Sequence, residues 1–143
     1  MKREDLADNT IDMLASSAIN ARDNAYTPYS GFKVGAALLT KGMGFIYTGS
    51  NIENASFGTG TCAERAALYR AASAAEREFD AIAVAGWSDI GEINYTAPCG
   101  ICRQALSEFV DEDFLVILVK ARDDYKILTF AEIFPHAFDS TSL

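Results

Sequence analysis

The sequence predicts a layered α/β domain, with helices packed against a mixed sheet of about five strands. Short apolar runs that suit buried strands alternate with longer segments of helical composition along the chain. The chain has 143 residues, of which 50% are hydrophobic, so it can bury a substantial core. We therefore expect residues 1–143 to form one domain.

The first part of the chain predicts a helix followed by a β-hairpin. Four apolar residues are spaced by four, three and four positions, which places them on one face of a helix that ends at about Asn24. A loop with proline and glycine follows. The segments Phe32–Leu39 and Phe45–Thr48 predict two paired strands, joined by a glycine turn at residues 41–44. The four helical residues are Ala7, Ile11, Leu14 and Ala18.

The second part of the chain alternates predicted helices and strands. An alanine-rich segment from Cys62 to about Ala75 favours a helix. Another helix should begin after Pro98, with Ile101, Ala105 and Phe109 on its apolar face. The remaining expected elements are strands at Ala81–Gly86, Phe114–Val119 and Lys126–Thr129, a turn at residues 122–124 and a short helix at Phe130–Phe134.

Composition and charge limit the partners of the protein. The formal net charge is -8, which disfavours a polynucleotide partner because such binding depends on clustered lysine and arginine. A small, nearly neutral substrate is easier to reconcile with this charge. The N-terminal segment has no apolar region typical of a signal peptide, and no run approaches the length of a membrane span. We expect a soluble cytoplasmic protein.

All three cysteines fall in two short motifs. Cys62 is followed by Ala63, Glu64 and Arg65, and Cys99 and Cys102 form a Pro-Cys-x-x-Cys motif. An odd number of cysteines without a signal peptide disfavours a disulfide framework and favours metal or redox chemistry. If the two helices follow neighbouring strands on one face of the sheet, their N-termini converge and bring the cysteines together. Helix N-termini also favour thiolates.

Three thiolate ligands indicate a catalytic zinc site, because a structural site normally closes with a fourth protein ligand. A lone ligand-x-Glu followed by Pro-Cys-x-x-Cys is the known pattern of zinc-dependent base deaminases. One alternative is a structural Cys3His site closed by His136, the single histidine. A redox pair of Cys99 and Cys102 is another, but it gives Cys62 and Glu64 no role.

Glu64 and Arg65 each have a chemical and a structural interpretation. Beside a zinc ligand, the Glu64 carboxylate is placed to take a proton from water and return it to a substrate nitrogen. The alternative is a glutamate that caps the helix start. Arg65, three residues after Cys62, can lie on the same face as that ligand and donate to its sulfur. The alternative is a solvated surface charge.

The chain resembles the cytidine deaminases of the small, homotetrameric type with three cysteines. The resemblance covers nearly the whole chain. It rests on the motifs PYSGFKVGAAL at residues 28–38, NIENASF at 51–57, CAER at 62–65 and PCGICRQ at 98–104. The second motif separates it from other deaminases. The chain departs from the family at Phe57, where many relatives carry tyrosine, and in the glycine-rich residues 58–61.

The resemblance implies a three-layer α/β/α fold and the hydrolytic deamination of cytidine and deoxycytidine to uridine and deoxyuridine in pyrimidine salvage. It also implies one Zn2+ per chain and a homotetramer with pockets shared between subunits. The implied residue roles are zinc binding by Cys62, Cys99 and Cys102, proton transfer by Glu64, ribose binding by Asn51 and Glu53, contact with the base by Phe32, contact with the amino group by the Ala63 backbone, and completion of a neighbour's pocket by Phe138. Alternatives are deamination of a related aminonucleoside such as blasticidin S, a zinc-stabilised binding module without catalysis, and an RNA or DNA editor.

Overall fold

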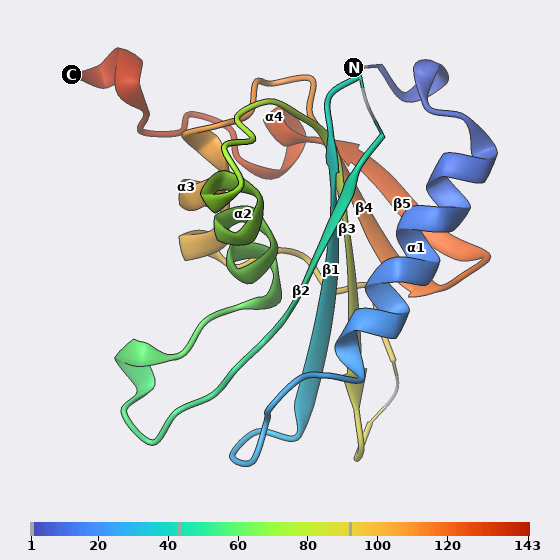
Figure 1. Cartoon of the computed structure of the whole chain (residues 1–143), viewed down its shortest axis with the longest axis vertical. Helices are drawn as coiled ribbons and strands as arrows, with labels where there is room; N and C mark the ends of the chain where they lie inside the picture. Colours follow the sequence, from blue (N-terminus) through green and yellow to red (C-terminus); the bar gives the residue numbers. More distant parts are fainter. Residues whose placement is uncertain (1, 43, 92) are drawn as a thin grey trace.

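The structure is a computed structural model that describes residues 2–42, 44–91 and 93–143. Three layers make up this part of the chain (Figure 1). Helix α1 (Asp8–Arg22) covers one face of a five-stranded sheet, and α2 (Ala63–Ser73) and α3 (Gly100–Ser107) cover the other. The predicted α/β/α fold with a mixed sheet is therefore confirmed.

The sheet has the strand order β2-β1-β3-β4-β5. Strands β3 and β4 are parallel, and the other neighbouring pairs are antiparallel. Each predicted strand is present, and each end lies within two residues of its expected position. The predicted turn between β1 and β2 includes Met43, which lies outside the described residues. The strands are β1 (Phe32–Thr40), β2 (Ile46–Ser50), β3 (Phe79–Ser88), β4 (Leu115–Ala121) and β5 (Asp124–Thr129).

The helices agree with the predicted ones except in detail. Ala7 is exposed because it is the N-cap residue of α1, and the helix ends at Arg22, two residues before the expected Asn24. The predicted apolar face of α3 is wrong at Ile101, whose side chain is 64% exposed. The fully buried residues of α3 are instead Cys102 and Leu106. The predicted last helix is present as α4 (Phe130–Ile133). The structure also has three short 3-10 helices that the sequence did not predict, at Arg3–Asp5, Phe57–Thr59 and Ser140–Ser142.

Two apolar layers form the core, one on each face of the sheet. On β1, Ala36 and Leu38 pack in the layer of α2 and α3, whereas Ala37 and Leu39 pack in the layer of α1. Successive side chains of a strand point to opposite faces, so a strand that is covered on both faces needs apolar residues throughout. This burial explains the continuous apolar runs in the sequence.

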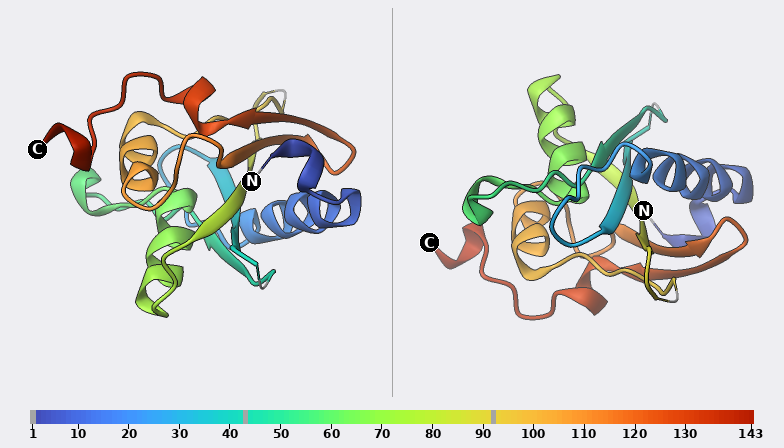
Figure 2. Two further views of the ribbon diagram at one scale, coloured as in Figure 1. Left: turned by 90° about the horizontal axis from the view of Figure 1, so that it is seen from above. Right: turned by 90° about the horizontal axis from the view of Figure 1, so that it is seen from below.

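Helices α2 and α3 lie side by side on the same face of the sheet (Figures 1 and 2). They follow β2 and β3, and β1 lies between these two strands, so the strands are not direct neighbours as the prediction assumed. A Cβ atom added at Gly49 would lie 2.4 Å from the Ala63 carbonyl oxygen and 2.4 Å from the Ala67 amide nitrogen. The absence of a side chain at Gly49 therefore lets the start of α2 approach β2 closely.

No helix in the described ranges is both long enough and apolar enough to cross a membrane.

Candidate active site

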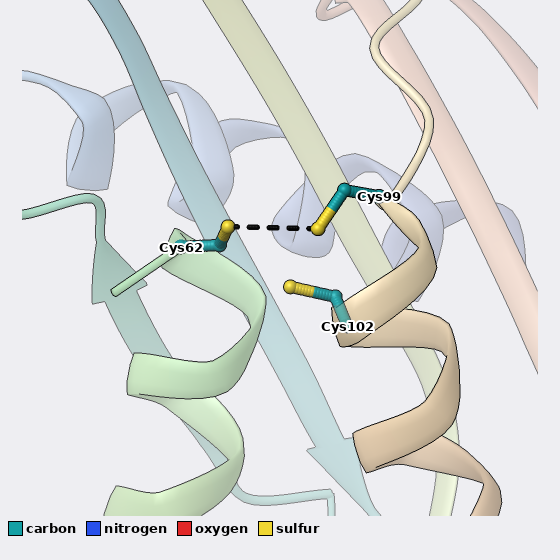
Figure 3. A group of neighbouring side chains, drawn as sticks. All are labelled: Cys62, Cys99 and Cys102. Atoms are coloured by element: carbon teal, nitrogen blue, oxygen red, sulfur yellow. Dashed lines mark hydrogen bonds between the residues drawn. The ribbon is translucent and has the colours of Figure 1, made fainter. Parts of the chain in front are cut away.

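The N-termini of α2 and α3 bring the three cysteines together (Figure 3). Cys62 is the N-cap residue of α2, Cys99 is the N-cap residue of α3, and Cys102 lies in the first turn of α3. Their sulfur atoms all lie within 4.8 Å of one another, and the Cys62 and Cys99 sulfurs are 3.7 Å apart. Zinc–sulfur bonds of about 2.3 Å in a tetrahedron place two sulfurs roughly 3.8 Å apart. The three thiols are thus positioned to bind one metal ion.

His136 does not join this group. Within the described residues, the cluster of metal-binding side chains at α2 and α3 consists of the three cysteines. The alternative of a structural Cys3His site is therefore not supported. All three cysteines are free thiols, and Cys62 shares the group with the Cys-x-x-Cys pair, so a role for that pair alone is also not supported.

The surroundings of Cys62 favour the ionised form of its thiol. A hydrogen bond from Cys102 lowers the pKa of Cys62 to about 5, and hydrogen bonds from Arg65 and Cys99 act in the same direction against the effect of burial. The pKa of Cys102 is raised, because its thiol donates to the Cys62 thiolate and because it is buried. Cys62 therefore favours the thiolate form, which is the form in which cysteine binds a metal cation.

Arg65 contacts the cysteine group directly. Its guanidinium Nη2 donates to the Cys62 sulfur at 3.5 Å, and this contact raises the pKa of the guanidinium. Its Nε atom is buried and has no hydrogen-bond partner among the described residues. The interpretation of Arg65 as a fully solvated surface charge therefore does not fit the geometry.

Glu64 is a buried carboxyl group beside the cysteines. Its side chain is only 4% exposed, in the first turn of α2. Burial raises the pKa of Glu64 to about 7, and the negative charge of Cys62 adds to this effect. A carboxyl group with a pKa near neutrality can both accept and return a proton.

A cavity of about 580 Å³ opens beside these residues. It has room for a small organic molecule, since ligand pockets typically measure about 300 to 1,000 Å³. The predicted site residues that line it are Phe32, Asn51, Glu53, Cys62, Ala63, Glu64, Arg65 and Cys99. The buried Cys102 lies behind Cys62 and Cys99 in the same sulfur group.

Comparisons with known proteins identify the family. A family model described as the cytidine and deoxycytidylate deaminase zinc-binding region matches residues 8–118. The chain belongs to this deaminase family. A cytidine deaminase from Halalkalibacterium halodurans is 44% identical over 131 residues, which cover 92% of this chain and 96% of the relative. A cytidine deaminase from Sporosarcina psychrophila is 40% identical over 133 residues, which cover 93% of this chain and 94% of the relative. The crystal structure of cytidine deaminase from Burkholderia pseudomallei has a TM-score of 0.79 and 42% identity, covering 88% of this chain and 97% of that one.

The polar side chains predicted to bind ribose in this deaminase also hold the loop before β1. The Asn51 amide accepts from the Val34 amide nitrogen through Oδ1 and donates to the Phe32 carbonyl oxygen through Nδ2, both at 2.8 Å. The Glu53 carboxylate accepts from the backbone of Tyr29 at 3.0 Å and of Ser30 at 3.1 Å, and from the Ser30 hydroxyl. The Ser30 hydrogen bonds lower the pKa of Glu53.

Phe138, like the buried Cys102, is a predicted site residue that does not line the cavity of its own chain. Its side chain is 62% exposed. Its carbonyl oxygen accepts from the Gln104 side chain at 2.8 Å, which fixes the C-terminal segment to α3.

Several lining residues of the deaminase cavity were not predicted from the sequence. They include Tyr29, Ser30, Thr96 and Ala97. Phe57 also lines the cavity, is 82% exposed, and packs edge-on against the Tyr29 ring at a centroid distance of 6.2 Å. The position of Ser30 two residues before Phe32, in the same motif, was the signal that could have found it.

Proposed function

We propose that this chain is a zinc-dependent cytidine deaminase, which converts cytidine and deoxycytidine to uridine and deoxyuridine and serves pyrimidine salvage. The observation that carries the proposal is the group of three cysteines beside a buried glutamate in one open cavity. Membership of the deaminase family supports the same reaction. A binding module stabilised by zinc would have no use for a carboxyl group buried beside a cavity, because burial disfavours its charged form.

The donor set of the site fits zinc. Cys62, Cys99 and Cys102 would hold one ion per chain and leave a fourth position for a small molecule. When bound there, zinc supplies the Lewis acidity that makes water a nucleophile near neutral pH.

Glu64 is the proposed proton carrier. Its carboxylate takes a proton from the attacking water and gives it to N3 of the cytosine ring. The second proton of the same water, carried by the new hydroxyl on C4, then passes to the departing amino group, so that cytidine and water become uridine and ammonia. A pKa of about 7 supports transfer in both directions. The backbone of Ala63, at the buried start of α2, is the proposed contact of the amino group.

Phe32, Asn51 and Glu53 are the proposed nucleoside contacts. The Phe32 ring is 39% exposed at the cavity wall, where it can pack against the base. The Asn51 amide uses one of its two N–H groups for the Phe32 carbonyl, so one N–H stays available for a sugar hydroxyl. The ionised Glu53 carboxylate would accept a hydrogen bond from a second hydroxyl of the sugar.

We also propose that the single domain of residues 1–143 forms a homotetramer in the cytoplasm. Phe138, exposed and held to α3, would enter the pocket of a neighbouring subunit. The proposal includes no membrane partner and no nucleic-acid partner, in agreement with the net charge of -8.

Ammonia release tests the proposed function. Purified protein should release ammonia from cytidine and deoxycytidine, much more slowly from free cytosine, and not from cytosine within an oligonucleotide. Elemental analysis should find about one zinc per chain. Glu64→Gln, which is nearly isosteric, should keep the zinc and lose most turnover. Faster deamination of blasticidin S than of cytidine, or near-normal turnover by the glutamine variant, would contradict the proposal.

A further inference from the structure

Ser30 connects two of the proposed nucleoside contacts. Its hydroxyl donates to the Glu53 Oε2 atom and accepts from the Phe32 amide nitrogen at 3.0 Å. Its backbone nitrogen donates to the other carboxylate oxygen, Glu53 Oε1, which also accepts from the Tyr29 amide nitrogen. One residue thus contributes two of the three hydrogen bonds that the structure gives this carboxylate.

These bonds leave little freedom to the Glu53 carboxylate. An ionised carboxylate has about four acceptor positions. Two backbone donors occupy Oε1, and the Ser30 hydroxyl occupies one position on Oε2. The remaining position on Oε2 can accept from one further donor, such as a sugar hydroxyl. Without the Ser30 hydroxyl the two backbone donors would still hold Oε1, but the direction of Oε2 would be less constrained, because the terminal torsion of a glutamate is broad.

The same hydroxyl is part of a network that extends along the cavity wall. Phe32 donates to Ser30 through its amide nitrogen and accepts from Asn51 through its carbonyl oxygen. Asn51 in turn accepts from the Val34 amide nitrogen. The proposed contacts to the base and to the sugar hydroxyls therefore share one chain of hydrogen bonds, in which Ser30 joins Phe32 to Glu53.

We propose that Ser30 is a positioning residue for the nucleoside, which holds the Glu53 carboxylate and the Phe32 backbone in the orientation that binds the sugar and the base. This inference rests on the proposed function, since it takes the ligand of the cavity to be a nucleoside. A purely local role is the alternative, because a serine hydroxyl commonly accepts from the amide two residues later and so stabilises a turn.

Steady-state kinetics of Ser30 variants test the proposal. Ser30→Ala should raise the KM for cytidine about tenfold, as expected for the loss of a hydrogen bond to a charged group, and should change kcat much less. Ser30→Thr keeps a hydroxyl and should restore most of the affinity. Ser17→Ala, on α1 across the sheet, is the matched control and should behave as the wild type. A lower kcat with an unchanged KM in Ser30→Ala would overturn the proposal.

A double-mutant comparison separates positioning from a local role. In a Glu53→Gln background, Ser30→Ala should raise KM by much less than in the wild type, because the group that it orients has been replaced. Equal increases in the two backgrounds would mean that Ser30 acts without Glu53, which contradicts the proposal.

A measurement without substrate keeps the inference separate from the proposed function. Carbon NMR of the Glu53 side chain should give a pKa below the usual range in the wild type and a higher one in Ser30→Ala. If the wild type fails to deaminate cytidine but the Glu53 pKa is still higher in Ser30→Ala than in the wild type, the proposed function is wrong and the contact between Ser30 and Glu53 is supported. An unchanged Glu53 pKa in Ser30→Ala contradicts the inference whatever the substrate.

Discussion

At the scale of single residues, the site places opposite charges and a buried acid within one helical turn. Glu64 is buried beside Cys62, and Arg65 donates to the same sulfur. Burial and the thiolate both disfavour the ionised form of Glu64, whereas Arg65 favours it. The result is a carboxyl group near the midpoint of its titration at neutral pH, which suits a group that takes and returns protons.

This arrangement predicts a pH-dependent stability. The pKa of Glu64 in the folded protein, about 7, lies above its ordinary value of 4.5. The protonated Glu64 side chain therefore contributes its full stabilisation of the folded state below pH 4.5, and this stabilisation is lost as the pH rises through about 7. Relative to Glu64→Gln, the wild type should lose about 2 kcal/mol of unfolding free energy between about pH 5 and about pH 8. Urea unfolding of both zinc-stripped proteins at equal concentration checks this. If the unfolding free energies of the two proteins change in parallel with pH, the pKa of Glu64 is not raised by burial.

Arg65 leads to a second prediction at this scale. Because its guanidinium lies 3.5 Å from the Cys62 sulfur, it stabilises negative charge in the site. Arg65→Gln should keep its zinc, turn over more slowly at neutral pH, and show the acid limb of its pH–rate profile at a pH about one unit higher. Arg65→Lys, which keeps the charge, should show a smaller change. An unchanged acid limb with full zinc content in Arg65→Gln would mean that Arg65 does not act on the site electrostatically.

At the scale of elements, α3 is held in place by a side chain within the same motif as the cysteines. Arg103 donates to the Pro98 carbonyl oxygen through Nε at 2.8 Å and to the Ile133 carbonyl oxygen through Nη1. It therefore ties the residue before Cys99 to the end of α4. We therefore expect this contact between segments that are distant in sequence to help fix the position of Cys99.

Removing this contact should weaken the metal site without removing a ligand. In Arg103→Ala, zinc transfer to a competing chelator should be about ten times faster, since hydrogen bonds from charged donors stabilise by about 1.5 to 3 kcal/mol. Arg77→Ala is the matched control, because Arg77 also donates to two carbonyl oxygens, those of Ala72 and Glu76, at the far end of α2. Equal transfer rates in Arg103→Ala and the wild type would show that the α3 N-terminus is fixed by other contacts.

The elements also show how far the sequence determines the structure. Strand positions were predictable from short continuous apolar runs, and helix positions from apolar residues spaced by three or four and from alanine-rich composition. The buried face of α3 could not be predicted, because a helix of eight residues has too few turns to show whether Ile101 or Cys102 points inward. The cysteine group was predictable from its two motifs, although the helices that carry them do not follow neighbouring strands as the prediction assumed. The contacts of Ser30 with Glu53 and of Arg103 with Ile133 could not be predicted, because they join segments that are 23 and 30 residues apart in the sequence and no periodic pattern links them.

At the scale of the whole molecule, aromatic side chains remain exposed around an open cavity. Phe57 lines the cavity and is 82% exposed, and Phe138 is 62% exposed on a segment fixed to α3. Exposed aromatic residues of this kind are enriched in protein interfaces. They support an assembly in which a neighbouring chain covers the cavity and completes it.

A subunit-mixing experiment tests whether Phe138 completes a neighbour's cavity. Light scattering should give the mass of a tetramer, and Phe138→Ala should have a raised KM for cytidine, because a desolvated aromatic contact in an interface is typically worth about 2 kcal/mol or more. In mixed tetramers with the inactive Glu64→Gln chain, which keeps its phenylalanine, the Phe138→Ala chains should regain affinity for cytidine. Mixing with the double variant Glu64→Gln/Phe138→Ala is the control and should restore nothing, since that chain has no phenylalanine to donate. Equal KM values in the two mixtures, or a fully active monomer, would mean that each chain builds its pocket alone.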